Sequence, residues 1–128
     1  MAFFDCLSTK KNSSLADRRS QLRRQYRAAR RALPPYQQYA QAKKLCALLK
    51  RCPEFIHAKS IASYLPSDGE IDPSMIHQLA WALGKRVYLP VPTQQKSLRF
   101  VPYTSQTQLV TGQWGIQQPR CAARIATQ

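Results

Sequence analysis

The sequence predicts one α/β domain with three layers, in which helices cover both faces of a mainly parallel sheet. The length of 128 residues fits a single domain, and 44% hydrophobic residues suffice for one core. Helical and strand-like segments alternate along the chain. Between residues 60 and 91 a strand, a short helix and a second strand follow one another, which is the order of a βαβ unit with a parallel strand pair.

Two helices are predicted in the first part of the chain. Ser14, three residues before Asp17, can cap the first, which should end before Pro34 because the residue ahead of proline avoids helical angles. Pro35 suits the first turn of the second helix, and Pro53 should end it. The residues expected to be buried repeat at helical spacing: Leu15, Leu22, Tyr26, Ala29 and Leu33 in the first helix, then Tyr39, Ala42, Leu45, Cys46 and Leu49 in the second.

The remaining elements follow from short apolar runs between turn residues. Residues 60–65 and 85–91 are predicted strands, and 98–103 is a third strand near an edge, because Pro102 cannot donate to a neighbour. Asp72–Pro73 should start the intervening helix and Gly84 should end it. The core residues predicted in this helix are Ile76, Leu79, Ala80 and Leu83.

The charge of the chain is high and unevenly distributed. Lys and Arg number 20 against 6 Asp and Glu, a formal net charge of +14, and between Lys10 and Arg51 the one acidic residue is Asp17. Such a segment attracts partners that carry phosphate, and arginine can pair with two phosphate oxygens at once. A solvated helix face is the simpler interpretation. A small basic nucleic-acid-binding module also remains an alternative, and its binding should weaken steeply with salt.

Several classes of protein and site are excluded by composition and motif. No apolar run approaches the ~18 residues of a membrane span. The 4 cysteines have no metal-ligand spacing, so reduced thiols in a cytoplasmic protein and no metal site are predicted. There is no P-loop, dinucleotide-binding fingerprint or Ser-His-Asp arrangement. His57 and His77 are predicted to be surface or boundary residues, with His77 on the outer face of its helix.

Three carboxylates gather in the loop after the first predicted strand. Asp72 is explained by helix capping, and Asp68 beside Gly69 by a turn. Glu70 is explained by neither. A carboxylate at the carboxyl end of a strand can accept N–H groups of a heterocyclic ligand such as a pterin. Trp114 is a core residue or a platform on which a ring could stack.

The order of these segments resembles the 5-formyltetrahydrofolate cyclo-ligase family, also called 5,10-methenyltetrahydrofolate synthetase. The resemblance covers residues 15–119. The predicted organisation is a flexible arm (1–13), a single domain (14–119) and an unmatched tail (120–128). The segments that carry it are the basic helix Arg18-Arg-Ser-Gln-Leu-Arg-Arg-Gln-Tyr-Arg27, the strand and loop Ile61-Ala-Ser-Tyr-Leu-Pro-Ser-Asp-Gly-Glu-Ile-Asp72, Gly84-Lys-Arg-Val-Tyr-Leu-Pro-Val91, Leu98-Arg-Phe with Tyr103, and Gly112-Gln-Trp-Gly-Ile-Gln-Gln-Pro119.

The resemblance implies a fold like that of the ribose-phosphate isomerase and CoA-transferase group. It implies ATP-dependent conversion of 5-formyltetrahydrofolate to 5,10-methenyltetrahydrofolate with Mg²⁺. The family's phosphate-binding basic pair corresponds to Arg19 and Arg23, where Arg19 replaces a lysine. The residues it assigns to ATP are Arg19, Ser20, Gln21, Leu22 and Arg23, and those it assigns to the folate are Leu65, Glu70 and Trp114; it assigns no catalytic residue or metal ligand.

The sequence departs from the family pattern at its C-terminal end. Family members continue with further strands and a glycine-rich segment that cradles the ATP phosphates, and no such segment follows Pro119 here. We therefore expect an incomplete sheet, self-association through its exposed edge, and little or no cyclo-ligase turnover from residues 1–128.

Overall fold

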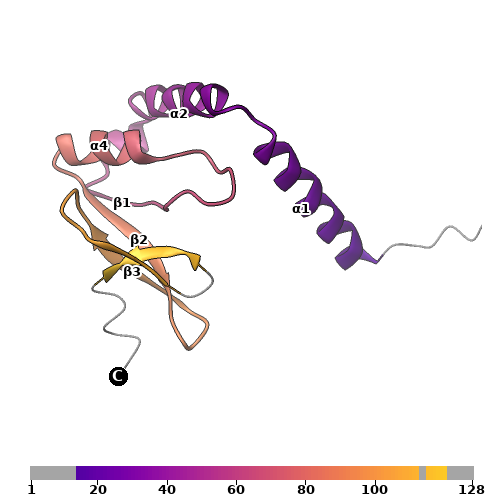
Figure 1. The fold of residues 1–128 in the computed structure, drawn as a ribbon. Helices are drawn as coiled ribbons and strands as arrows, with labels where there is room; N and C mark the ends of the chain where they lie inside the picture. The colour runs from indigo at the N-terminus through magenta and orange to yellow at the C-terminus, as the bar shows by residue number, and fades with distance from the viewer. Residues whose placement is uncertain (1–13, 113–114, 121–128) are drawn as a thin grey trace, which may run out of the picture.

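The computed structural model describes residues 14–112 and 115–120. The predicted arm (1–13), Trp114 and residues 121–128 of the predicted tail lie outside the described residues. Figure 1 shows how the elements are arranged. Their order is α1 (Leu15–Arg31), α2 (Pro35–Leu49), α3 (Pro53–His57), β1 (Ser60–Ala62), α4 (Ser74–Ala82), β2 (Arg86–Pro92), β3 (Leu98–Tyr103), β4 (Leu109–Thr111) and β5 (Gln117–Pro119).

The bounds of α1 are those that its terminal residues predict. Ser14 accepts the backbone N–H of Asp17 through its hydroxyl, and the Asp17 carboxylate accepts the N–H of Ser14, which forms a capping box. The helix ends ahead of Pro34. It extends away from the strands (Figure 1), and none of its residues is buried. The apolar stripe predicted as a core face therefore stays exposed, with Leu15 at 80% and Tyr26 at 66%.

Two prolines open the next two helices. Pro35 starts α2 as predicted, and Pro53 starts α3, a five-residue helix that the sequence did not predict. Ala42 and Cys46 are the buried residues of α2. Tyr39, predicted to be buried, is 63% exposed and lines an open pocket with Ser74 and Met75 at the start of α4.

The described sheet is mixed rather than mainly parallel. Its strand order is β1-β2-β3, with β1 parallel to β2 as predicted and β2 antiparallel to β3. The short connection over residues 93–97 explains the second pairing, because a parallel pair needs a crossover of a dozen residues or more. β3 lies at an edge as predicted. A separate hairpin of β4 and β5, also antiparallel, was not predicted.

The core lies between β2 and the helices on one side of the sheet. α4 packs on β2 and α2 packs on α4 (Figure 1). Val87, Ala80 and Phe55 are among the buried residues at this junction. On the opposite face of the sheet Phe100 is 51% exposed. The described residues therefore form a mixed α/β fold, and the predicted third layer is not confirmed.

Candidate functional site

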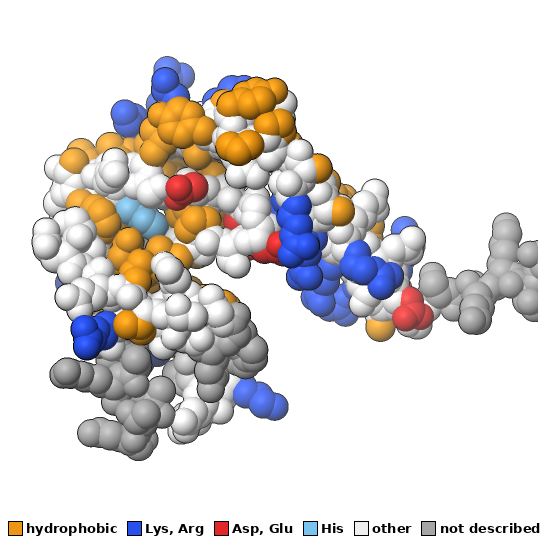
Figure 2. Space-filling model, viewed as in Figure 1, with side chains coloured by type: hydrophobic (Ala, Val, Ile, Leu, Met, Phe, Trp, Pro, Cys, Tyr) orange, Lys and Arg blue, Asp and Glu red, His pale blue; other side chains and the backbone are white. Residues whose placement is uncertain are grey.

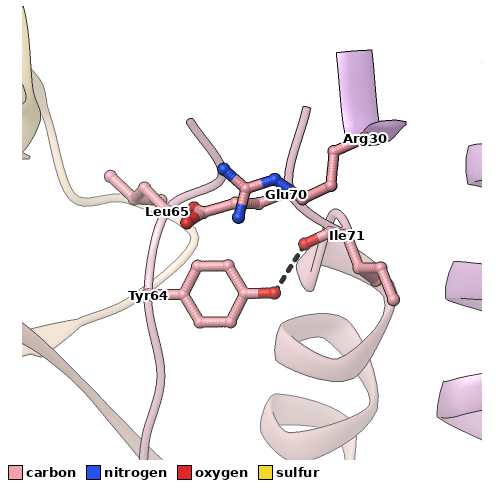
Figure 3. A pocket seen from close by; sticks show the side chains of 5 residues that line it. All are labelled: Arg30, Tyr64, Leu65, Glu70 and Ile71. Atoms are coloured by element: carbon pink, nitrogen blue, oxygen red, sulfur yellow. Dashed lines mark hydrogen bonds between the residues drawn. The ribbon is translucent and has the colours of Figure 1, made fainter. Parts of the chain in front are cut away.

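The loop between β1 and α4 lines a pocket of about 400 Å³ against the end of α1. Figure 3 shows the side chains that line it, which are Arg30, Tyr64, Leu65, Glu70 and Ile71. The Tyr64 hydroxyl donates a hydrogen bond of 2.7 Å to the backbone oxygen of Ile71, which ties one side of the loop to the other. Burial raises the pKa of Tyr64, and the charges of Glu70 and Asp72 raise it further, so its phenol stays protonated.

A turn over residues 67–70 presents Glu70 to this pocket. The backbone N–H of Glu70 donates to the Ser67 oxygen at 3.1 Å, and Glu70 Oε2 accepts the Ser67 N–H at 3.2 Å. The prediction that no turn contact explains Glu70 is therefore wrong. Its other carboxylate oxygen, Oε1, has no hydrogen-bond donor among the described residues. The turn thus orients the carboxylate and leaves one acceptor available.

Asp68 joins this turn to the last turns of α1. Its carboxylate lies 2.9 Å from Arg27 Nε and 3.7 Å from Arg30 Nη2, and it also accepts a short hydrogen bond from Arg31 Nε. Asp68 and Gly69 both have positive φ, as the predicted turn requires. A Cβ atom at Gly69 would lie 3.3 Å from the backbone oxygen of Arg30. The close approach of loop and helix thus depends on a glycine there.

Of the predicted binding residues that the structure describes, Leu65 and Glu70 lie together in the pocket, and the segment Arg19 to Arg23 lies apart from it. The predicted ATP segment, Arg19 to Arg23, lies along the exposed part of α1, where Figure 2 shows basic side chains gathered. Arg23 is seven residues before Arg30, which is about 10 Å along a helix axis. The pocket and this segment therefore share one helix without sharing one cavity. The predicted role of Trp114 falls outside the described residues.

Two residues of this region, Arg30 and Asp68, were not predicted as parts of the site. Arg30 continues, at helical spacing, the basic face of the first helix that includes Arg19, Arg23 and Arg27. Nothing in that spacing shows that only the end of this face meets the loop. Asp68 pairs with residues far away in the sequence: its partner Arg31 is 37 positions earlier. Local pattern carries no signal for such a pairing. Asp72, by contrast, accepts the N–H of Ser74 at 2.9 Å, which confirms its predicted place at the start of α4.

His77 is buried, and the prediction that it lies on the outer face of its helix is wrong. Only 2% of the residue is exposed, because the inward face of α4 carries Ile76, His77 and Ala80. Its Nε2 lies 2.7 Å from Ser63 Oγ, directly after β1. The ring meets that of Tyr103 edge-on at 5.3 Å between centroids. His77 therefore links α4 to the strand end from which the site loop starts.

We expect the protein to lose stability as the pH falls below about 6.5, the ordinary pKa of histidine. Burial lowers the pKa of His77, an effect that Asp72 partly offsets. The unfolded chain then binds a proton that the folded chain resists, so the free energy of unfolding should fall by at most about 1.4 kcal/mol per pH unit. The pH window lies between the ordinary pKa and the lowered one.

Urea unfolding of the protein and of His77→Gln at a series of pH values measures this dependence. The variant should show a flatter dependence over that window, whatever its stability at neutral pH. His57→Gln is the matched control, since His57 is exposed on α3. An equal slope in the protein and in His77→Gln would contradict the assignment to His77.

The described residues contain neither a metal-binding cluster nor a membrane-spanning helix. No three His, Cys, Asp or Glu side chains in 14–112 and 115–120 lie where they could hold a metal ion. Cys46 and Cys52 are free thiols. In the same part of the chain, no helix has the length and apolar character needed to cross a bilayer.

The chain is similar to named enzymes over most of its own length. The 5-formyltetrahydrofolate cyclo-ligase of Escherichia coli K12 is 35% identical over 100 residues, which cover 77% of this chain and 55% of that protein. The protein of the same name from Haemophilus influenzae is 33% identical over 105 residues, covering 80% and 56%. The chain thus spans about half the length of the curated relatives it matches.

Solved structures agree with these matches. The NMR structure of Aquifex aeolicus 5,10-methenyltetrahydrofolate synthetase superposes with a TM-score of 0.67 at 27% identity, over 79% of this chain and 51% of that one. The Mycoplasma pneumoniae synthetase gives a TM-score of 0.57 at 20% identity, over 66% and 52%, which supports the fold alone. The family model of the 5-formyltetrahydrofolate cyclo-ligases matches residues 16–126, nearly the whole chain. The chain belongs to the 5-formyltetrahydrofolate cyclo-ligase family.

Proposed function

We propose that this chain supplies the folate pocket and the first phosphate-binding helix of an ATP-dependent 5-formyltetrahydrofolate cyclo-ligase. The observation that carries the proposal is the pocket at the carboxyl end of β1. There Leu65 offers apolar contact, and Glu70 presents a carboxylate oxygen that has no partner in 14–112 and 115–120. A carboxylate of this kind can accept two neighbouring N–H groups of a pterin ring.

The reaction forms a carbon–nitrogen bond with ATP as the source of activation. The formyl oxygen attacks the γ-phosphorus and releases ADP, the neighbouring nitrogen attacks the activated carbon, and inorganic phosphate leaves to give 5,10-methenyltetrahydrofolate. The role proposed for α1 is to hold ATP phosphates through Arg19 and Arg23, with Ser20, Gln21 and Leu22 between them. Guanidinium groups are suited to this role because they pair with two phosphate oxygens.

Mg²⁺ would reach this site with the nucleotide. The described residues form no set of carboxylates for it, so none of them is assigned as a ligand. Mg²⁺ usually keeps several waters and binds substrate phosphates with few protein ligands. The cation would then neutralise phosphate charge beside α1.

We place this chemistry in the cytoplasm, where reduced thiols such as those of Cys46 and Cys52 persist.

The proposed partners are the folate and ATP. The names of the matched proteins give no support to the nucleic-acid-binding alternative. Self-association through a sheet edge stays a prediction: β1 and β3 are the outer strands of the described three-stranded sheet.

Titration of 5-formyltetrahydrofolate and of ATP with the chain tests the proposed function, and Arg23→Ala separates the two ligands. We expect this variant to weaken ATP binding about tenfold, because one charge-assisted contact is lost, and to leave the folate affinity unchanged. Arg24→Ala is the matched control: it removes the same charge from the neighbouring position of α1. Calorimetry that shows no folate binding to the unaltered chain would refute the proposal. Equal loss of ATP affinity in both variants would reduce the role of Arg23 to general charge attraction.

A further inference from the structure

Arg30 is the one basic residue of α1 that lines the folate pocket. Arg30 is half-buried, and every other residue of α1 is exposed. Its side chain is 42% exposed, against 56% for Arg27 and 62% for Arg31. In Figure 3 its guanidinium group reaches from α1 over Tyr64 and Glu70. Arg30 therefore brings a positive charge to a cavity whose other lining residues supply one carboxylate and apolar or phenolic groups.

The hydrogen-bonding capacity of Arg30 is not used within the described part of the chain. Its Nε is buried and has no hydrogen-bond partner there, and its Nη2 is 3.7 Å from Asp68, beyond hydrogen-bonding distance. Arg27 and Arg31 hold the two oxygens of Asp68 more closely. A buried donor that is left without a partner costs about 1–3 kcal/mol. Because Nε itself is enclosed, a ligand acceptor would meet this guanidinium group through its Nη atoms.

The pocket thus offers an acceptor and a donor side by side. Glu70 Oε1 is free of donors in the described residues, and the guanidinium group of Arg30 lines the same pocket. Arg30 and Glu70 form no ion pair within 4.0 Å, so neither group satisfies the other. The ligand that complements this pair has two N–H donors next to a carbonyl oxygen. One edge of a pterin, with its 2-amino group, N3–H and C4 oxygen, has that pattern.

We propose that Arg30 is a substrate-binding residue that donates a hydrogen bond to the C4 oxygen of the folate ring, while Glu70 accepts its two N–H groups. The inference rests on the proposed function and adds to it a residue that selects the 4-oxo ring. A 4-amino ring in the same orientation would place a donor against the donors of Arg30. Such a mismatch leaves polar groups unpaired in the pocket and is strongly unfavourable.

The test compares 5-formyltetrahydrofolate with its 4-amino-4-deoxy derivative as ligands of the unaltered chain and of Arg30→Met. Fluorescence titration is done at mildly alkaline pH, where the ring nitrogens are neutral. We expect Arg30→Met to bind the 4-oxo compound about tenfold more weakly, since a hydrogen bond to a charged group is worth about 1.5–3 kcal/mol. Affinity for the 4-amino compound should stay the same or rise.

Arg24→Met is the matched control, because it removes an arginine of the same helix that neither pairs with Asp68 nor lines the pocket. It should leave both affinities near those of the unaltered chain. Equal effects of the two variants, or equal loss of both ligands in Arg30→Met, would overturn the contact with the C4 oxygen and leave the proposed function standing. Failure of the unaltered chain to bind 5-formyltetrahydrofolate would overturn both. Circular dichroism of each variant verifies that the helices are retained.

Discussion

Residues 1–128 alone are expected to bind 5-formyltetrahydrofolate and ATP without converting them at a measurable rate. Phosphoryl transfer depends on donors that hold the transferred group in line with the attacking oxygen. In the described residues Arg19 and Arg23 face solvent from one side, and no glycine-rich loop lies opposite them. Each preorganised donor that is missing costs roughly 10²–10³ in rate, so the loss of several should leave almost no turnover.

The measurement is the near-ultraviolet absorbance of methenyltetrahydrofolate in the presence of ATP and Mg²⁺. The full-length Escherichia coli cyclo-ligase is a suitable positive control, since this chain matches 55% of it. Calorimetry on the same sample verifies that both ligands bind. A rate within about tenfold of that control would contradict the expectation, because tenfold corresponds to about 1.4 kcal/mol, less than one missing donor contributes.

Glu70→Gln should weaken 5-formyltetrahydrofolate binding about a hundredfold and leave ATP affinity unchanged. The amide oxygen of glutamine can still accept the Ser67 N–H, so the turn is retained. The amide nitrogen then replaces the free oxygen and meets ring N–H groups with N–H groups of its own. Loss of a charged acceptor together with this repulsion corresponds to about 3 kcal/mol.

Fluorescence titration of Glu70→Gln measures the effect, with Glu54→Gln as the matched control. Glu54 carries the same charge on the exposed part of α3, where it accepts a hydrogen bond from the Cys52 thiol and does not line the pocket. Unchanged folate affinity in Glu70→Gln would remove Glu70 from the site. Weakened ATP binding in the same variant would indicate instead that the loop and α1 move together.

The parts of the fold that sequence predicted are those decided by local chemistry. Ser14 with Asp17, Pro35, and Asp72 ahead of α4 each mark a helix start through contacts within a few residues. Strand direction and burial depend on distant partners instead. The antiparallel pairing of β3 was not predicted, and the inward orientation of His77 was predicted wrongly, because neither is specified by its own segment.

The same distinction applies to the candidate site. Glu70 was predicted from its place in one loop and Leu65 from the family resemblance, and the structure places both in one pocket. Arg30 comes from a helix more than thirty residues earlier, and it reaches the pocket only because Asp68 and Gly69 dock on α1. The charge run alone could not distinguish it from Arg19 or Arg23.

The exposed position of α1 would couple the folding of this helix to the phosphate binding that is proposed for it. No residue of this helix is buried, and Asp68 is its main tie to the loop. A helix of 17 residues is only marginally stable by itself in water, so α1 can open while the core stays intact. A polyphosphate that binds only the helical form then stabilises that form by RT ln(1 + [L]/Kd), where [L] is the concentration of free polyphosphate. The observed affinity is weaker than that of the preformed helix, because binding must also order the arginines. Nucleotide concentration would therefore regulate how much of the time this segment is helical.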